Sequence, residues 1–208
     1  MNGAPVEAAG LSLEGPQGWV YRDVAVAAAP GDLVCVAGAG GTGRTSLLLT
    51  LAGRMRPDHG QVKVAGLRQP YRIQKVASLA VLAGVNDLEP LLTVGEHLRE
   101  RLTGLGWFSG PAGHSRARGA LGAVGLDLDW GRLTGTLDSV EMTLFGVALA
   151  LLETPQVVIV DDVGRGVTGD RLPEVWEPLG GLPITVIAAC VDPSPVATSV
   201  VTMPVDRG

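Results

Sequence analysis

A run of glycines that ends in a cation and two hydroxyl residues is the first segment whose residue types could do chemistry. Residues 38–45 read GAGGTGRT, which fits the pattern G-x-x-x-x-G, then a basic residue, then Ser or Thr. Glycines let backbone N–H groups turn towards an anion, and a helix that begins here points the positive end of its dipole at the same place. The pattern predicts a phosphate-binding loop. The residues predicted to contact the nucleotide are Gly38, Gly40, Gly41, Thr42, Gly43, Arg44, Thr45 and Ser46.

The loop departs from its usual pattern at Arg44, where lysine is standard. Lysine is a compact point charge, whereas arginine is a planar fork that prefers bidentate contacts. Arg44 can therefore hold a phosphate, although its bulk would shift the γ-phosphate. The alternative interpretation is a glycine-rich turn that caps a helix and leaves Arg44 in solvent. The Thr45 hydroxyl stands where such loops hold Mg²⁺.

The elements that must position the loop follow from the apolar periodicity. Strands are predicted over 20–26, 34–37, 61–64, 157–160, 185–190 and 200–204, and helices over 45–51, 94–102, 121–126 and 142–152. Residues 105–119, rich in Gly, Pro, Ser and Arg, are predicted to form a loop. Strands that alternate with helices, together with a helical middle, indicate an α/β protein with a parallel sheet and a helical insertion.

With four further segments added, the chain resembles the ATP-binding cassette (ABC) ATPase family over nearly its whole length. These segments are the turn at 30–32, the RPDHG turn at 56–60, DLEPLLTVGEHL at 87–98, and ALALLETPQVVIVD at 148–161. They keep the family's order and approximate spacing. The resemblance implies a P-loop NTPase fold with a mostly parallel central sheet, an antiparallel β portion near the N-terminus and a helical insertion. It also implies one domain over residues 1–208, with a helical subdomain at roughly 86–146.

The resemblance gives roles to the two carboxylates that close the strand at 157–160. Asp161 matches the family's Walker B aspartate, which holds Mg²⁺ through water; the alternative is a turn residue at a strand end. Asp162 occupies the place of the general-base glutamate but is one methylene shorter. A displacement of about 1 Å at a reacting group can cost roughly 10²-fold in rate. Asp162 is therefore expected either to work slowly or only to support the site.

Other positions depart further from the family pattern. The Q-loop glutamine aligns with Gly84, the switch histidine with Val191, and the aromatic that stacks on adenine aligns near Gly15. Trp19 or Tyr21 could replace that aromatic, with core packing as the alternative for both.

The family's signature sequence aligns with residues 137–141, where two glycines are replaced and Asp138 and Glu141 add negative charge that opposes closure over ATP. The favoured interpretation there is a helix start with Asp138 as its cap and Glu141 at the third helical position.

Composition limits the partners. The net charge is −5 and no dense run of Lys and Arg is present, so nucleic acid is not an expected partner. Cys35 and Cys190 lie in apolar runs and are expected to be small core residues rather than a disulfide. No segment is long and apolar enough to span a bilayer, and the N-terminus lacks the features of a signal peptide. Any membrane role is therefore expected to run through a partner.

Three functional hypotheses remain open on the sequence. The first is an ATP-binding subunit of a bacterial transporter or related membrane assembly, with ATP and Mg²⁺ as cofactors. It would be a homodimer, or a heterodimer with another ABC ATPase, and would dock on transmembrane permease subunits from the cytoplasmic face of the cell membrane. The second is a sensor or scaffold that binds ATP with little turnover. The third is a P-loop kinase, whose arginine-rich lid would come from Arg116, Arg118 and Arg132.

Overall fold

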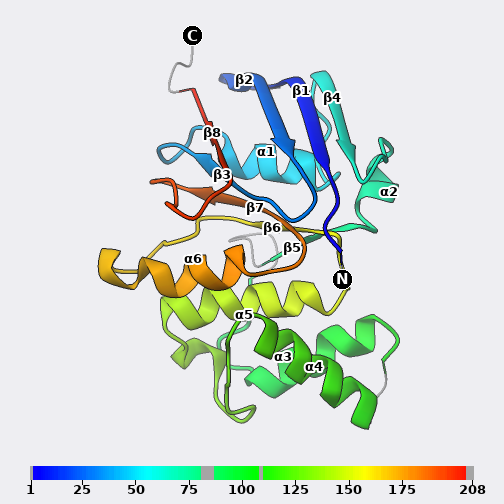
Figure 1. Cartoon of the computed structure of the whole chain (residues 1–208), viewed down its shortest axis with the longest axis vertical. Coiled ribbons are helices and arrows are strands. Elements are labelled where there is room, and N and C mark those ends of the chain that lie inside the picture. The colour runs from blue at the N-terminus through cyan, green and yellow to red at the C-terminus, as the bar shows by residue number, and fades with distance from the viewer. Residues whose placement is uncertain (1, 81–86, 108–109, 205–208) are drawn as a thin grey trace.

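The computed structural model describes residues 2–80, 87–107 and 110–204 (Figure 1). The strands are β1 (Val6–Gly15), β2 (Gly18–Ala28), β3 (Leu33–Ala37), β4 (His59–Val64), β5 (Ala77–Leu79), β6 (Val157–Val160), β7 (Thr185–Cys190) and β8 (Ser199–Thr202). The helices are α1 (Arg44–Leu51), α2 (Pro70–Ile73), α3 (Val94–Gly104), α4 (Pro111–Ala123), α5 (Ser139–Leu151) and α6 (Leu172–Gly180). Two short 3₁₀ turns, η1 (Thr134–Thr136) and η2 (Gly169–Arg171), complete the described elements.

The centre of the molecule is a five-stranded parallel sheet with the order β5-β6-β7-β3-β8. Strands β3, β6 and β7 are buried at every position, as expected for parallel strands covered on both faces. Alternation along β3 sends Leu33, Cys35 and Ala37 into one core and Val34 and Val36 into the other. The sheet therefore divides the molecule into two apolar layers and brings the C-terminal ends of β3 and β6 to the same edge.

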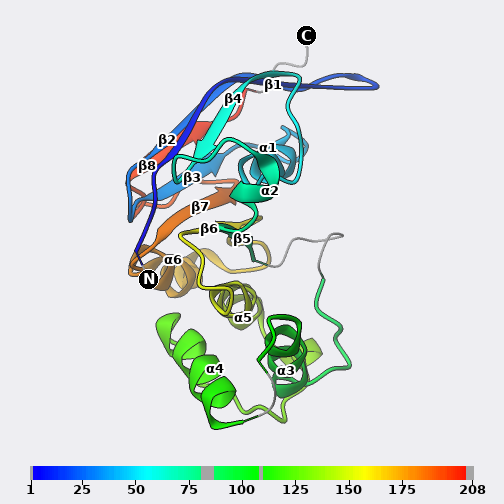
Figure 2. The same ribbon diagram turned by 90° about the vertical axis from the view of Figure 1, so that its right-hand side faces the viewer.

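One layer lies between the parallel sheet and helices α5 and α6, with α3 and α4 packed beyond α5 (Figures 1 and 2). Phe145 of α5 is fully buried there. The other layer lies between the parallel sheet, α1 and a three-stranded antiparallel sheet with the order β2-β1-β4. Leu47 and Leu48 of α1 are fully buried in it. The antiparallel sheet thus covers the helix that follows the glycine run.

Strand β1 is the central member of the antiparallel sheet, and the sequence patterns did not predict it. It pairs with β2 on one side and β4 on the other, and it contains register shifts around Leu11. Val6 and Ala8 are buried, whereas Glu7 between them is exposed. The alternation is present, but alanine and glycine make it weak because they carry little apolar surface.

The prediction of a loop over residues 105–119 is wrong from Pro111 onward, because α4 occupies Pro111–Ala123. Its first turn carries proline, which is accommodated there since the first helical N–H groups have no partner within the helix. The buried face is built from small residues, Gly113, Ala117 and Ala120, followed by Leu121. A face of glycine and alanine gives little hydrophobic contrast, so the helical period was hidden by the polar residues between.

Short elements around the parallel sheet were also not predicted. Strand β5 has three residues and pairs with β6, and α6 carries Pro178 inside it. Proline normally argues against a helix interior, which masked the buried Val175, Trp176 and Leu179. Of the helices that the structure describes, none has the length and apolarity needed to cross a membrane.

Candidate nucleotide-binding site

The glycine run connects the end of β3 to the start of α1, and its shape depends on glycine. The Gly38 N–H donates to the Cys190 carbonyl of β7 at 3.2 Å, which ties the start of the loop to the parallel sheet. Gly43 has a φ of 84°, and a Cβ there would lie 2.3 Å from the Val20 carbonyl oxygen. Only glycine fits this position, since both the left-handed backbone and the close approach exclude a side chain. The loop is therefore held between β7 and β2.

Arg44 is buried at the N-terminus of α1, with 8% of its side chain exposed. Its Nη2 donates to Asp162 Oδ1 at 2.8 Å. Its Nη1 is buried and has no hydrogen-bond partner among the described residues. A buried cation requires a counter-charge, since leaving water costs several kcal/mol. The interpretation that leaves Arg44 in solvent is therefore wrong.

Thr45 and Asp161 meet beside this ion pair. The Thr45 hydroxyl donates to Asp161 Oδ2 at 2.6 Å, across 116 residues of sequence. The other carboxylate oxygen of Asp161 accepts the backbone N–H of Asp162 at 2.9 Å. A hydroxyl and a carboxylate are the hard oxygen ligands that Mg²⁺ prefers, and Thr45 is exposed enough to take one. The donor set therefore fits Mg²⁺.

Asp162 leaves the end of β6 with a left-handed backbone, φ 46°. Besides Arg44, it has Arg165 Nη1 3.7 Å from its Oδ2, and 38% of its side chain is exposed. The i,i+3 spacing to Arg165 was visible in the sequence, whereas the pairing with Arg44 was not. Asp161, Asp162 and Arg165 line a cleft of about 290 Å³ that extends to Leu137 and Ser139 at the start of α5.

The segment 137–141 forms the predicted helix start. Asp138 Oδ1 accepts the N–H groups of Val140 and Glu141, and the Glu141 carboxylate accepts the Asp138 N–H, so the capping box is confirmed. Asp138 also pairs with Arg171 at 3.2 Å.

A second ion pair lies at the same helix start. Arg132 pairs with Glu141 through both its terminal nitrogens, at 2.6 and 2.8 Å. The hydrogen bond from Arg132 holds the pKa of Glu141 below its ordinary value. The backbone N–H of Glu141 does the same for the pKa of Asp138. The cap could be predicted from the sequence, but the two arginines could not, because they lie too far away in sequence to be recognised by spacing.

The two aromatic candidates for base stacking have other contacts. Tyr21 is buried, and its hydroxyl lies 2.7 Å from the Thr50 hydroxyl, which makes it a core residue. Trp19 packs against His59 at 6.2 Å between ring centroids, and the Arg22 guanidinium lies 5.3 Å from its ring centre. Burial therefore supports the core-packing alternative for Tyr21.

Two other aligned positions contribute less to the site. Gly84 lies outside the described residues. Val191 directly follows β7 and is 60% exposed, so it presents an apolar side chain where the family pattern has histidine.

The arginines proposed for a kinase-type lid are engaged elsewhere. Arg116 donates to the Leu152 carbonyl at 3.0 Å and lies over the Trp107 ring at 5.0 Å. Arg132 belongs to the helix start described above. The described arginines therefore do not form the lid that the kinase hypothesis requires.

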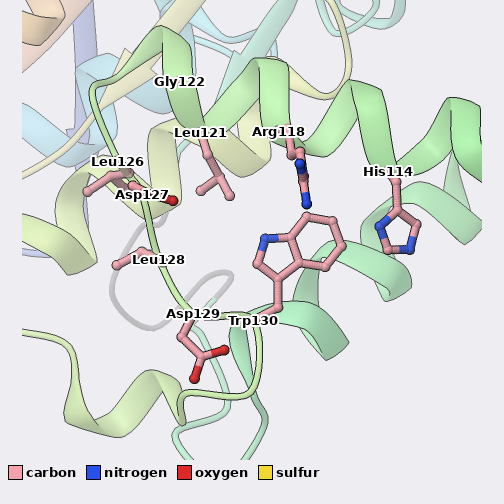
Figure 3. A pocket seen from close by; sticks show the side chains of 9 residues that line it. All are labelled: His114, Arg118, Leu121, Gly122, Leu126, Asp127, Leu128, Asp129 and Trp130. Carbon is pink, nitrogen blue, oxygen red and sulfur yellow. The ribbon is translucent and has the colours of Figure 1, made fainter.

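Arg118 points into a separate cavity of about 660 Å³ on the helical segment (Figure 3). The His114 and Trp130 rings both line it and stack on each other, 4.7 Å apart and 18° from parallel. Asp127 and Asp129 also line it, Asp127 on the side of Trp130 away from His114 and Asp129 below Trp130 (Figure 3). None of the lining residues belongs to the glycine run, so we assign no part of the nucleotide site to this cavity.

The fold and the site together define a P-loop α/β protein: a glycine-rich loop between the buried strand β3 and a helix, with two carboxylates at the end of β6, which is separated from β3 by β7 in the parallel sheet. The family model described as "ABC transporter" matches residues 21–164, well over half of the chain. The chain belongs to the ABC transporter family. Membership of this family implies nucleotide binding.

The relatives agree with this assignment. The ribose import ATP-binding protein RbsA of Corynebacterium glutamicum is 26% identical over 163 residues, which cover 76% of this chain and 31% of that protein. The ribose import ATP-binding protein RbsA 3 of Rubrobacter xylanophilus is 31% identical over 174 residues, which cover 81% of this chain and 35% of that protein. The chain thus spans about a third of the length of the curated relatives that it matches.

A solved structure shows the same fold. An ATP-binding cassette of an ABC transporter, crystallised in its ADP conformation, superposes with a TM-score of 0.76 at 16% identity. The match covers 96% of this chain and 87% of that one. The α/β P-loop fold with its parallel and antiparallel sheets is therefore confirmed.

Proposed function

We propose that this chain is the ATP-binding subunit, or the ATP-binding part, of an ABC transporter or a related membrane assembly. The observation that carries the proposal is the buried Arg44 at the end of the glycine run, with an Nη1 that has no partner among the described residues. A cation held in this way at a helix N-terminus is suited to an anion with several oxygens. The residues proposed to bind the phosphates are Gly38, Gly40, Gly41, Thr42, Gly43, Arg44, Thr45 and Ser46.

Thr45 and Asp161 are the proposed Mg²⁺ ligands, Asp161 acting through water. Their side chains already meet at 2.6 Å and supply oxygen donors only. When bound with the nucleotide, Mg²⁺ neutralises phosphate charge. Asp162 is the proposed general base for slow hydrolysis, since it follows Asp161 at the end of β6 and faces the cleft.

The remaining parts of the proposal concern the assembly. The whole chain, residues 1–208, would be one cassette domain with a helical subdomain at roughly 86–146. It would act as a homodimer or a heterodimer with another ABC ATPase. It would contact transmembrane permease subunits from the cytoplasmic side of the membrane. Support comes from the relatives, whose names describe import ATP-binding proteins.

The proposal is tested by mixing trace labelled Mg·ATP with excess protein, then separating bound from free label and ATP from ADP. Arg44→Ala should lower the affinity about 100-fold, because the phosphate loses the buried cation proposed to hydrogen-bond it. Arg118→Ala, which removes an exposed arginine on α4, is the matched control and should bind as the parent does.

The outcomes separate binding from turnover. Label that binds and becomes ADP supports an ATPase that drives a partner. Label that binds and stays ATP supports binding and rejects Asp162 as a working base. If neither the parent nor Arg118→Ala retains label at the highest protein concentration, the proposed nucleotide site is refuted, while the fold assignment stands.

A further inference from the structure

The counter-charge for Arg44 comes from within the chain. Asp162 Oδ1 accepts from Arg44 Nη2 at 2.8 Å, although the two residues are 118 positions apart in sequence. Arg44 is 8% exposed, so this carboxylate neutralises a cation that is almost removed from water. The guanidinium that the proposed function assigns to a phosphate is therefore already bound to an anion of the protein.

Asp162 satisfies only part of the guanidinium. Arg44 Nη1 is buried and has no partner among the described residues. A buried N–H without an acceptor is costly, and native proteins rarely keep one without a reason. A phosphoryl group offers several oxygens to one guanidinium, so it can satisfy nitrogens that a single carboxylate oxygen leaves unpaired. The geometry thus favours a phosphate over the carboxylate as the better partner for Arg44.

The two anions cannot share Arg44 without penalty. A carboxylate and a phosphate on one buried cation repel each other at short range, where screening by water is weak. The Asp162 carboxylate has an alternative partner and access to solvent. Its side chain is 38% exposed, and the exposed Arg165 lies 3.7 Å from its other oxygen. Its backbone is also in the left-handed region, φ 46°, which non-glycine residues adopt at a cost.

We infer that Asp162 is an internal competitor for the phosphate site, which sets the nucleotide affinity by occupying Arg44 and must be displaced when a phosphoryl group binds. This inference rests on the proposed function. It also links the two roles of Asp162. While its Oδ1 accepts from Arg44, the carboxylate is held on the guanidinium rather than on a water molecule at the phosphate. Binding of the phosphate releases the carboxylate at the moment when a general base becomes useful.

The test compares the parent protein with Asp162→Asn by titration calorimetry, using ADP and inorganic pyrophosphate as separate probes. EDTA is present throughout, so that Mg²⁺ ligation by Asp161 does not contribute. Asparagine has the size of aspartate and tolerates a positive φ, but it carries no charge to compete with a phosphate. We expect both probes to bind the variant about tenfold more tightly, or better, because a charge-assisted hydrogen bond no longer has to be broken.

Asp192→Asn is the matched control. It removes the same charge from an exposed position just after β7, and in the described part of the chain no hydrogen bond or ion pair joins Asp192 to Arg44. Its affinity for pyrophosphate should stay within about twofold of the parent, since exposed charges are well screened. Asp162→Gly serves as a second variant in case Asp162→Asn does not fold, because glycine accepts the left-handed backbone freely.

The binding results for the parent and the variants distinguish the competition from the proposed function. Tighter binding by Asp162→Asn or Asp162→Gly, with Asp192→Asn unchanged, supports the competition, even where the parent binds too weakly to measure. Equal or weaker binding by both Asp162 variants, with measurable binding by the parent, overturns the competition and leaves the proposed function standing. Equal gains in Asp162→Asn and Asp192→Asn also overturn it, because net charge alone would explain them. If the parent and all variants bind neither probe, the proposed function fails together with this inference.

Discussion

The end of β6 and the start of α5 both gather carboxylates and arginines around one cleft, but they use them differently. At the start of α5, Asp138 and Glu141 satisfy each other's backbone N–H groups and are paired with Arg171 and Arg132. At the end of β6, Asp162 leaves one nitrogen of Arg44 buried and unpaired among the described residues.

The difference separates a structural charge cluster from the site that we propose binds a ligand. A cluster whose donors and acceptors match in number needs nothing from outside, and its contribution is to hold a helix start in place. A cluster in which one buried donor has no acceptor favours the binding of an anion, because the anion can accept that hydrogen bond. Residue types alone would not have told the two apart, since both contain aspartate and arginine.

The largest expected effect comes from a substitution within the glycine run. Gly43→Ala should destabilise the protein by about 3 kcal/mol, because its Cβ would meet the Val20 carbonyl and alanine resists the left-handed backbone. Gly40→Ala is the control, since a Cβ there has nothing within 4 Å, and it should cost less than about 1 kcal/mol. Urea denaturation measures both. Equal stability of the two variants would show that the contact between loop and β2 carries no weight.

Asp161→Asn sharpens the comparison by removing a proposed metal ligand while keeping an acceptor for the Thr45 hydroxyl. The gain in ATP affinity on adding Mg²⁺ should fall about tenfold or more, whereas ADP binding in EDTA should change little. Titration with and without Mg²⁺ measures the ratio. An unchanged Mg²⁺ effect would remove Asp161 from the metal site.

Asp138→Ala tests the structural cluster. Loss of the cap should lower the free energy of unfolding by about 1 kcal/mol, because the Val140 and Glu141 N–H groups lose their acceptor. The affinity for pyrophosphate should stay the same. Asp127→Ala, at an exposed position after α4, is the control and should leave stability unchanged. A drop in phosphate affinity with intact stability would contradict a purely structural role.

The smallest effect is a pH dependence of the same helix start. Arg132 holds the pKa of Glu141 below its ordinary value of 4.5. A carboxyl with a lowered folded pKa stabilises the protein above its unfolded pKa, and this stabilisation is lost as pH falls through the folded pKa. Between about pH 5 and pH 3, the parent should therefore lose slightly more stability than Glu141→Gln, which keeps the capping pattern. Melting temperatures of the parent and Glu141→Gln across that pH range measure the difference. Parallel plots of melting temperature against pH for the two proteins would contradict the prediction.

Much of the parallel sheet could be predicted, because long apolar runs bounded by glycine and proline leave few choices. The strands at β3, β6 and β7 and the loop between β3 and α1 all carried strong local signals. The prediction failed where the buried face is built from glycine and alanine, as in β1 and α4, and where proline lies inside a helix, as in α6. Small residues pack well but leave little hydrophobic contrast in a sequence.

The site was predictable as a set of residues but not as a set of contacts. The glycine run and the two aspartates were found from their neighbours, and the structure places them together. The pairing of Arg44 with Asp162 spans 118 residues, and no periodicity encodes such a contact. The burial of Arg44 likewise depends on tertiary packing rather than on residue type.

The glycine run is attached to both sheets at once. Gly38 is bonded to the Cys190 carbonyl of the parallel sheet, and Gly43 rests against the Val20 carbonyl of the antiparallel sheet. The six residues 38–43 thus connect two sheets that pack on α1 from opposite sides. A change in the angle between the layers would alter the curvature of the loop without any residue of the loop being touched. The shape of the proposed phosphate loop is therefore coupled to the relative position of the two sheets.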